Sequence, residues 1–168
     1  MIKGCTFLSD EFGVGGVNML KDFVEKKHFN FVDKVESWQE AIRVGCQPLV
    51  ADRTVDSTYA EQIIASVNKH GPYIVIIPGV AMPHVQENAA GVNKTSISFM
   101  KLKEAISFDE SDPDKEAKLF FTLASCNHDE HLANMQMLMA LLMNEELLAE
   151  LMEVDSVEEL LALHEKHL

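Results

Sequence analysis

The chain has 168 residues, which is the size of one ordinary domain. Hydrophobic residues make up 47% of it, enough to form a buried core without disulfides or metal ions, and this excludes a disordered protein. The formal net charge of −13 repels phosphate backbones and anionic lipid surfaces, which argues against a nucleic-acid partner. The same negative field speeds encounter with a basic protein surface.

The cysteines and the apolar segments indicate a cytoplasmic location. Cys5, Cys46 and Cys126 are odd in number and lack Cys-x-x-Cys spacing, which favours reduced thiols over a disulfide framework. The longest apolar stretch, residues 73–83, contains two prolines and a glycine and is shorter than the roughly 20 residues of a membrane helix. The N-terminal residues show no export signal. We therefore expect a cytoplasmic protein with no segment inserted in a membrane.

The N-terminal segment differs in composition from the rest of the chain. Four glycines and no helical or strand period up to Val17 predict a flexible leader at residues 1–18, followed by a domain at residues 19–168. Apolar residues at helical spacing then predict a helix at 19–24, and the next apolar run predicts a strand at 29–35.

Two helices are predicted from their capping sequences. Ser37 and Thr58 are each followed three residues later by glutamate, a pattern in which the two side chains satisfy each other's free backbone donors. The first helix is expected to end before Pro48, and the second at Gly71.

Strands dominate the middle of the chain and helices its end. Residues 73–77 are rich in β-branched side chains between helix breakers and predict a buried central strand. Further strands are predicted at 95–102 and 118–124, and the chain is helical after Asn127, with Ser156 capping the last helix. This order predicts an α/β domain whose sheet is covered by helices on both faces.

The helices after Asn127 are rich in methionine. Their methionines suit either core packing or an adaptable docking surface; they are Met135, Met137, Met139, Met143 and Met152. The apolar faces of these helices also leave open a homodimer as the oligomeric state.

Common nucleotide-binding and hydrolase motifs are absent from the sequence. It contains no GxGxxG, GxxxxGK[ST], HExxH or GxSxG, so no cofactor is expected. Seven histidines remain as candidates for chemistry. Four of them lie at predicted helix ends or near the C-terminus, where a helix dipole or solvent accounts for them; these are His28, His70, His164 and His167.

His84 follows the predicted buried strand through a rigid segment. Pro83 fixes its own backbone and restricts Met82, so the imidazole is expected at the carboxyl edge of a strand, where open α/β sheets bind ligands. The alternative is a turn histidine without a role. His131 lies near the start of the methionine-rich helix, next to a strand end, so it is expected at the same edge.

Two neutral imidazoles at one edge suit phosphoryl transfer. One ring nitrogen attacks phosphorus, while the other histidine orients it or donates a hydrogen bond to a phosphoryl oxygen. With an ordinary pKa of about 6.5, much of a histidine is neutral and nucleophilic at cytosolic pH.

A zinc site is the rival interpretation. Cys126, His128 and His131 form Cys-x-His-x-x-His, whose sulfur and imidazole atoms are ligands that zinc prefers, and such a site would serve a zinc-dependent hydrolase. The spacing is compressed, however, and no second ligand pair stands out elsewhere in the sequence.

Several segments match one family in order and spacing. They are Gln47-Pro48-Leu49-Val50, Gly71 to Ile76, Pro78 to His84, Gly91 to Thr95 and Asp129 to Leu132. From about Met19 to the end, the chain resembles the mannitol and fructose class of enzyme IIA domains of the bacterial phosphoenolpyruvate:sugar phosphotransferase system, and most closely the ascorbate-type branch.

The resemblance implies a fold, a reaction and two partners. The fold would be a mixed β-sheet flanked by helices. His84 would be the phosphorylated residue and His131 the second active-site histidine. The carrier protein HPr would donate the phosphoryl group, and a cysteine of enzyme IIB would accept it during uptake of a sugar such as ascorbate or a pentitol. A domain that instead signals its phosphorylation state to a regulator is the alternative.

One departure from the family concerns positive charge. The ascorbate branch commonly places a small residue and an arginine after the active histidine, whereas Val85 and Gln86 stand here. The only arginines are Arg43 and Arg53, so Lys94 or backbone donors would have to take the place of a bidentate cation.

Overall fold

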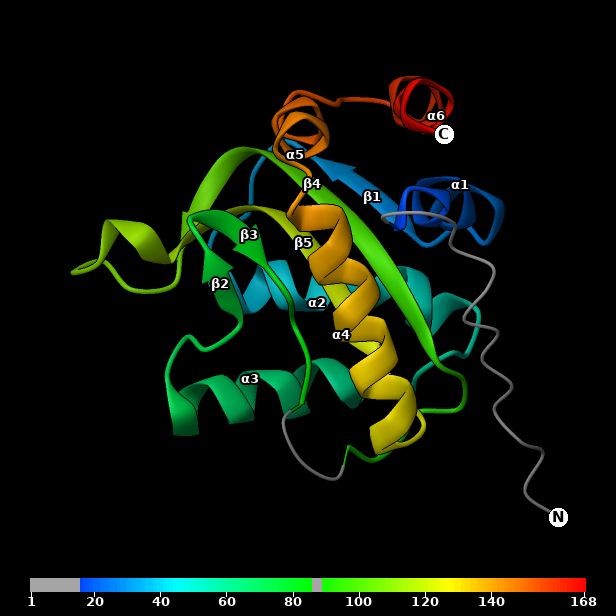
Figure 1. Cartoon of the computed structure of the whole chain (residues 1–168). Coiled ribbons are helices and arrows are strands. Elements are labelled where there is room, and N and C mark those ends of the chain that lie inside the picture. Colours follow the sequence, from blue (N-terminus) through cyan, green and yellow to red (C-terminus); the bar gives the residue numbers. More distant parts are fainter. Residues whose placement is uncertain (1–15, 86–88) are drawn as a thin grey trace, which may run out of the picture.

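One mixed sheet with helices on both faces forms the molecule (Figure 1). The computed structural model describes residues 16–85 and 89–168. The helices are α1 (Asn18–Glu25), α2 (Trp38–Ala51), α3 (Tyr59–His70), α4 (His128–Leu142), α5 (Glu145–Leu151) and α6 (Val157–His167), and a short 3₁₀ helix spans Pro113–Lys115. The strands are β1 (Phe29–Val32), β2 (Val75–Ile77), β3 (Gly79–Ala81), β4 (Ser96–Ser107) and β5 (Glu116–Ala124). The predicted fold class, an α/β domain with a mixed sheet between helices, is confirmed.

The strand order is β1-β4-β5-β3-β2. β1 runs parallel to β4 and β3 runs parallel to β5, whereas β4 pairs with β5, and β2 with β3, in the antiparallel sense. The prediction of a central strand at residues 73–77 is therefore wrong, because β2 lies at the edge of the sheet. Pro78 has no backbone donor and Gly79 adopts a φ of 89°, so the chain reverses after Ile77 into a short hairpin.

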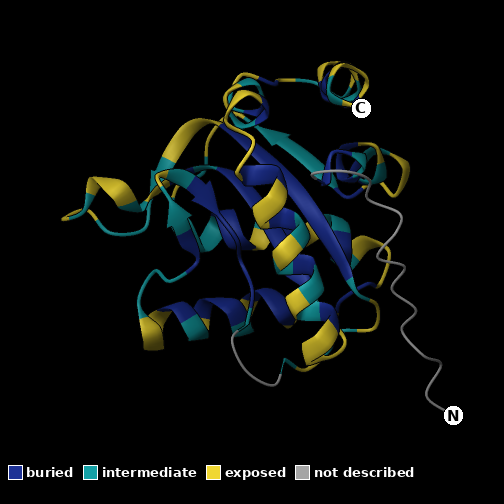
Figure 2. Ribbon diagram, viewed as in Figure 1, coloured by how far each residue is buried: buried dark blue, intermediate teal, exposed yellow. Residues whose placement is uncertain are grey.

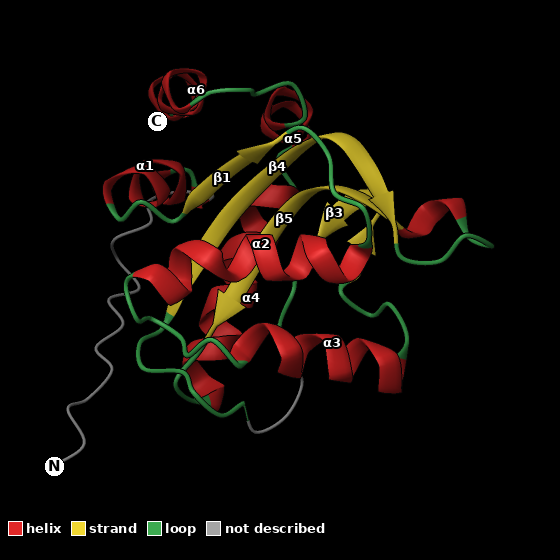
Figure 3. Cartoon of the chain, turned by 180° about the vertical axis from the view of Figure 1, so that it is seen from behind, coloured by secondary structure: helices red, strands yellow, loops and turns green. Residues whose placement is uncertain are grey.

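Two hydrophobic cores lie on opposite faces of the sheet. α2 and α3 cover one face (Figure 3), and α1, α4, α5 and α6 cover the other. Successive side chains of β5 alternate between the two cores, since strand residues point to opposite faces in turn: Leu119, Phe121 and Leu123 belong to one core, Phe120 and Ala124 to the other. The sheet is consequently buried on both sides (Figure 2).

α2 begins as predicted but continues past Pro48. The Ser37 hydroxyl accepts a hydrogen bond from the Glu40 N–H at 3.1 Å, which caps the helix. The predicted end before Pro48 is wrong, because the helix runs on to Ala51. Pro48 cannot donate to the carbonyl of Val44, four residues earlier, and that carbonyl instead accepts from the Asn30 amide at 2.9 Å. A side chain of β1 thus satisfies the acceptor that the proline leaves free.

The capping predictions for the other helices have different outcomes. Thr58 makes no side-chain cap, so the predicted capping box of α3 is wrong. α3 does end at Gly71, which has a φ of 80°. Ser156 caps α6 by accepting from the Glu159 N–H at 3.2 Å, as predicted.

The predicted leader lies mostly outside the described residues. Residues 1–15 are not described, whereas Val17 is buried in the core on the α1 side and Asn18 begins α1. Within the two described ranges, no helix is long and apolar enough to cross a bilayer.

Candidate functional site

The loop after β3 places His84 at the carboxyl end of that strand. β3 ends at Ala81, and the chain stays paired with both neighbours for two more residues: the Met82 N–H donates to the Ile74 carbonyl at 2.7 Å, and the Pro83 carbonyl accepts from the Leu123 N–H at 2.9 Å. His84 follows directly and is only 7% exposed. Its position is therefore fixed by the sheet.

The first turn of α4 supplies the second imidazole. Asn127 caps α4 by accepting from the Glu130 N–H at 2.9 Å, and the Glu130 carboxylate accepts from the Thr95 hydroxyl at 2.6 Å. His131 projects from the same turn, and its ring centroid lies 5.3 Å from that of His84. The structure thus brings together the two histidines that the sequence singled out, although 47 positions separate them along the chain.

The hydrogen bond of His84 determines which ring nitrogen is available. Nδ1 lies 2.6 Å from the Met82 carbonyl oxygen, which can only accept, so Nδ1 carries the proton. In the neutral ring Nε2 then holds the lone pair. Nε2 is therefore the nucleophilic atom of His84.

Both imidazoles are neutral at physiological pH. Burial lowers the pKa of His84 from 6.5, and the nearby His131 lowers it further, while the bond to Met82 acts in the opposite direction. Burial also lowers the pKa of His131, with a further contribution from the charge of His128. A lowered pKa keeps the lone pair of Nε2 unprotonated at pH 7.

Ser125 and Asn134 lie beside His131. The Ser125 hydroxyl is 3.5 Å from His131 Nδ1 and accepts from the Asn134 amide at 3.4 Å. Asn134 is fully buried, and its Oδ1 has no hydrogen-bond partner within the described part of the chain. No motif in the sequence marks either residue, although Asn134 lies three positions after His131 and so shares its helix face.

Tyr73 also contacts His84, and Ser66 contacts Tyr73. The Tyr73 ring stands edge-on to the His84 ring at a centroid distance of 5.2 Å, and its hydroxyl donates to the His84 carbonyl. Ser66 on α3 lies 2.9 Å from the same hydroxyl. The sequence predicts Tyr73 within a strand, but β2 begins at Val75, and no spacing in the sequence connects Tyr73 with His84.

The structure does not support the zinc site. Cys126, His128 and His131 do not come together: in the described residues, the possible metal ligands that lie within 4.8 Å of one another are Glu146, Glu150 and His167. Lys166 already pairs with this partly exposed cluster, with Nζ 2.8 Å from Glu150.

The thiol states differ from those expected. Cys126 is disulfide-bonded, so the expectation of a reduced thiol is wrong there, whereas Cys46 is free and buried. Cys5 lies outside the described residues.

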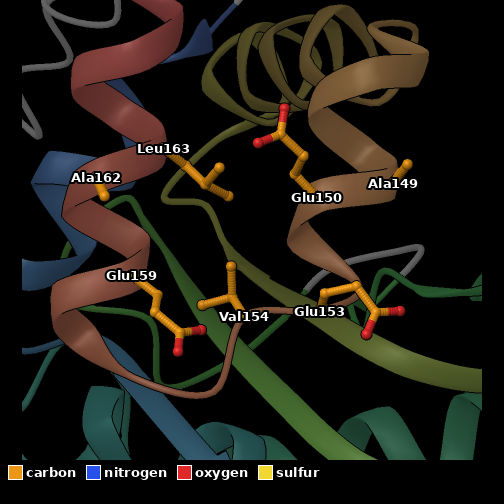
Figure 4. Close-up of a pocket in the computed structure, with 7 residues that line it drawn as sticks. All are labelled: Ala149, Glu150, Glu153, Val154, Glu159, Ala162 and Leu163. Atoms are coloured by element: carbon orange, nitrogen blue, oxygen red, sulfur yellow. The ribbon is translucent and has the colours of Figure 1, made fainter.

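A separate cavity of about 450 Å³ lies between α5 and α6 (Figure 4). Apolar side chains and three glutamates line it: Ala149, Glu150, Glu153, Val154, Glu159, Ala162 and Leu163. Neither imidazole borders this cavity, so it is not part of the histidine site.

Arg43 forms an ion pair away from the histidines. Its Nε lies 2.6 Å from the Glu61 carboxylate, which joins α2 to α3 on the outer surface. The Glu61 carboxylate raises the pKa of Arg43 and is itself held at a lowered pKa. The guanidinium therefore already has a carboxylate partner.

Comparison with known proteins identifies relatives in two sugar-specific groups. The family model "Phosphoenolpyruvate-dependent sugar phosphotransferase system, EIIA 2" matches residues 22–167. The ascorbate-specific PTS system EIIA component of Escherichia coli K12 is 36% identical over 107 residues, which cover 64% of this chain and 68% of that protein. The mannitol-specific cryptic phosphotransferase enzyme IIA component of the same strain is 30% identical over 141 residues, which cover 84% and 94%.

Solved structures share the fold. The solution structure of the mannitol-specific cryptic enzyme IIA from Escherichia coli matches with a TM-score of 0.76 at 29% identity, over 88% of this chain and 99% of that one. Enzyme IIA mannitol, solved in complex with phosphorylated enzyme IIB mannitol from Escherichia coli, has the same fold, with a TM-score of 0.71 at 24% identity over 83% and 95%. The chain therefore belongs to the EIIA 2 family of the phosphoenolpyruvate-dependent sugar phosphotransferase system, whose members carry a phosphoryl group.

Proposed function

We propose that His84 is the residue that carries the phosphoryl group, that phospho-HPr donates it, and that a cysteine of enzyme IIB accepts it. The observation that carries this proposal is a pair of neutral imidazoles whose ring centroids lie 5.3 Å apart. In this pair, Nδ1 of His84 is bound to the Met82 carbonyl. That arrangement leaves one defined nucleophilic atom, Nε2, next to a second imidazole.

Two displacements at phosphorus make up the reaction. In the first, the lone pair of His84 Nε2 forms a bond to phosphorus, and the bond from phosphorus to the donor's nitrogen breaks with its electron pair returning to that nitrogen. The phosphorylated ring keeps its Nδ1 proton and gains positive charge, which the Met82 carbonyl stabilises. In the second, a thiolate of enzyme IIB attacks phosphorus, and the electron pair returns to Nε2.

His131 supports the transfer from the start of α4. Its ring is close enough to His84 to donate a hydrogen bond to a phosphoryl oxygen, and such a bond strengthens as charge moves onto those oxygens. The positive end of the α4 dipole lies in the same turn and favours the phosphoryl dianion. The helix dipole supplies attraction for the phosphoryl group that Arg43 does not, because its guanidinium is paired with Glu61 outside the site.

An apolar stripe on α4 supports a protein partner at this site. Leu132, Met139 and Met143 are 45%, 39% and 77% exposed, and their spacing of seven and four residues places them on one helix face. The stripe begins directly after His131, and no charged side chain occurs from Leu132 to Asn144. Exposed apolar surface of this kind is typical of an interaction site.

The charge and the relatives support the choice of partners. The net charge of −13 complements a basic carrier such as HPr. A related enzyme IIA forms a complex with phosphorylated enzyme IIB mannitol. The proposal places the protein in the cytoplasm, where these partners meet it.

The identity of the transported sugar is inferred from the relatives. The ascorbate-specific and mannitol-specific components are 36% and 30% identical to the chain over their matched residues. We favour ascorbate or a related pentitol. The direct partner of His84 is in any case a protein cysteine, and sugar selection belongs to the membrane component.

A labelling experiment tests the proposal. The full chain is incubated with phosphoenolpyruvate, enzyme I and HPr, and intact-mass spectrometry follows an acid-labile increase of one phosphoryl group. His84→Ala is expected to abolish the increase, and the exposed His128→Ala to retain it. An unlabelled wild-type chain, or a labelled His84→Ala variant, would overturn the proposal.

A further inference from the structure

Tyr73 makes two contacts with His84. Its hydroxyl oxygen lies 2.5 Å from the His84 carbonyl oxygen, and its ring stands at 85° to the imidazole. Tyr73 lies just before β2 and His84 just after β3, so the two residues meet at the open end of the antiparallel hairpin. One tyrosine therefore holds both the backbone and the ring of His84.

The protons in this contact can be assigned from the chemistry of the groups. A carbonyl only accepts, so the single phenolic proton of Tyr73 goes to the His84 carbonyl. The Ser66 hydroxyl, 2.9 Å away, then donates to the phenolic oxygen. Burial raises the pKa of Tyr73, which keeps the phenol protonated and able to donate at neutral pH. Ser66, Tyr73 and His84 thus form a directed chain of two hydrogen bonds.

The hydrogen bonds around His84 secure successive peptide units. Met82 is bound through its N–H to Ile74, and Pro83 through its carbonyl to Leu123. Tyr73 binds the carbonyl of His84, the next along the chain. On the far side of the imidazole, the Val85 N–H donates to the buried Tyr59 hydroxyl. Without the Tyr73 bond, the His84 carbonyl would lose its donor, and the Tyr59 contact would remain to hold the peptide unit after the imidazole.

We propose that Tyr73 is a positioning residue for phosphoryl transfer, and that Ser66 orients it: together they hold His84 so that Nδ1 stays on the Met82 carbonyl and Nε2 stays the acceptor atom. The inference rests on the proposed role of His84 and extends it to two residues that do not touch the phosphoryl group. Tyr73 acts through the backbone and the ring contact.

Tyr73→Phe tests the inference because it keeps the ring and removes only the hydroxyl. We expect the phosphorylation rate at saturating phospho-HPr to fall roughly tenfold with the KM for phospho-HPr unchanged, since a small misplacement of a reacting atom costs one to two orders of magnitude. Ser66→Ala is expected to lower the rate in the same direction but less.

A spectroscopic readout separates positioning from a general effect on folding. In unphosphorylated protein, the ¹⁵N shifts of the His84 ring report which nitrogen carries the proton. The wild-type chain is expected to show the Nδ1–H tautomer alone, and Tyr73→Phe a mixture of both tautomers. Lys115→Met is the matched control. It removes another side-chain hydrogen bond to the β2–β3 hairpin, from Lys115 Nζ to the Val75 carbonyl at 3.3 Å, but does not touch His84.

The outcomes are distinguishable. A single Nδ1–H tautomer together with a wild-type rate in Tyr73→Phe would overturn the inference, and so would equal losses in Tyr73→Phe and Lys115→Met. The proposed role of His84 fails separately, through label retained in His84→Ala. The tautomer measurement needs no phosphoryl donor, so it decides the positioning of the ring in either case.

Discussion

At the scale of single residues, the proposed chemistry depends on two histidines, His84 and His131, whose pKa values are lowered by burial. The position of His84 after Pro83, and of His131 at a helix start, pointed to one sheet edge, and the rings lie 5.3 Å apart. Tyr73 was not predictable as a neighbour of His84, because the two meet across the β2–β3 hairpin and no sequence spacing indicates that contact. Asn134 has a local signal, since it lies three positions after His131 on the same helix.

The first prediction concerns protonation of His84. Because burial lowers its pKa, the folded protein takes up this proton only below pH 6.5, whereas the unfolded chain does so near 6.5. The unfolding free energy should therefore fall as the pH decreases from about 6.5 to the lowered pKa, and phosphorylation should not decline until the pH is below 6.5. An NMR titration of the His84 ring protons measures this directly. A midpoint at or above 6.5 would contradict the assignment.

At the scale of helices and strands, starts were more predictable than ends. Ser37 and Ser156 cap their helices through a local side-chain bond, which sequence spacing reveals. The end of α2 depends instead on Asn30, which lies on another element and binds the carbonyl that Pro48 leaves free. β2 is an edge strand that pairs only with β3, after Pro78 and Gly79 reverse the chain. The β-branched composition of β2 did not indicate this position.

A second prediction follows from the Asn30 bond. Asn30→Ala should lower the unfolding free energy by about 1 kcal/mol, because the Val44 carbonyl loses the donor that compensates for Pro48. Urea unfolding measures the change. Asn68→Ala, at an exposed position of α3, is the control and should stay within about 0.5 kcal/mol of wild type. Equal values for the two variants would show that the bond contributes nothing.

A third prediction concerns the apolar stripe of α4. Met139→Glu should raise the KM for the phosphoryl-transfer partners roughly tenfold, because a charge would be buried in an apolar interface. Its unfolding free energy should change little, since Met139 is exposed. Ser111→Glu adds the same charge in the turn before β5, at the end of that strand remote from His131, and should leave the KM unchanged. A stripe that binds a second copy of the chain would instead show as a loss of dimer on size-exclusion chromatography, with the KM unaltered.

At the scale of the whole molecule, alternating helices and strands were sufficient to predict a sheet covered on both faces. Buried residues recur on both sides of β5, and the two cores that result are separated by the sheet itself. The strand order was beyond the sequence pattern, because it depends on which edges pair. This order places β3 and β5 side by side, so that His84 after one strand meets His131 after the other.

The proposed assignment is that this juxtaposition forms a phosphoryl site whose acceptor is a single nitrogen. It is tested most directly by NMR of ¹⁵N-histidine-labelled protein after phosphorylation by phospho-HPr, where coupling to phosphorus identifies the bonded atom. The account predicts that phosphorus is bonded to Nε2 of His84, with Nδ1 still protonated. Phosphorus on Nδ1 of His84, or on any other histidine, would contradict it.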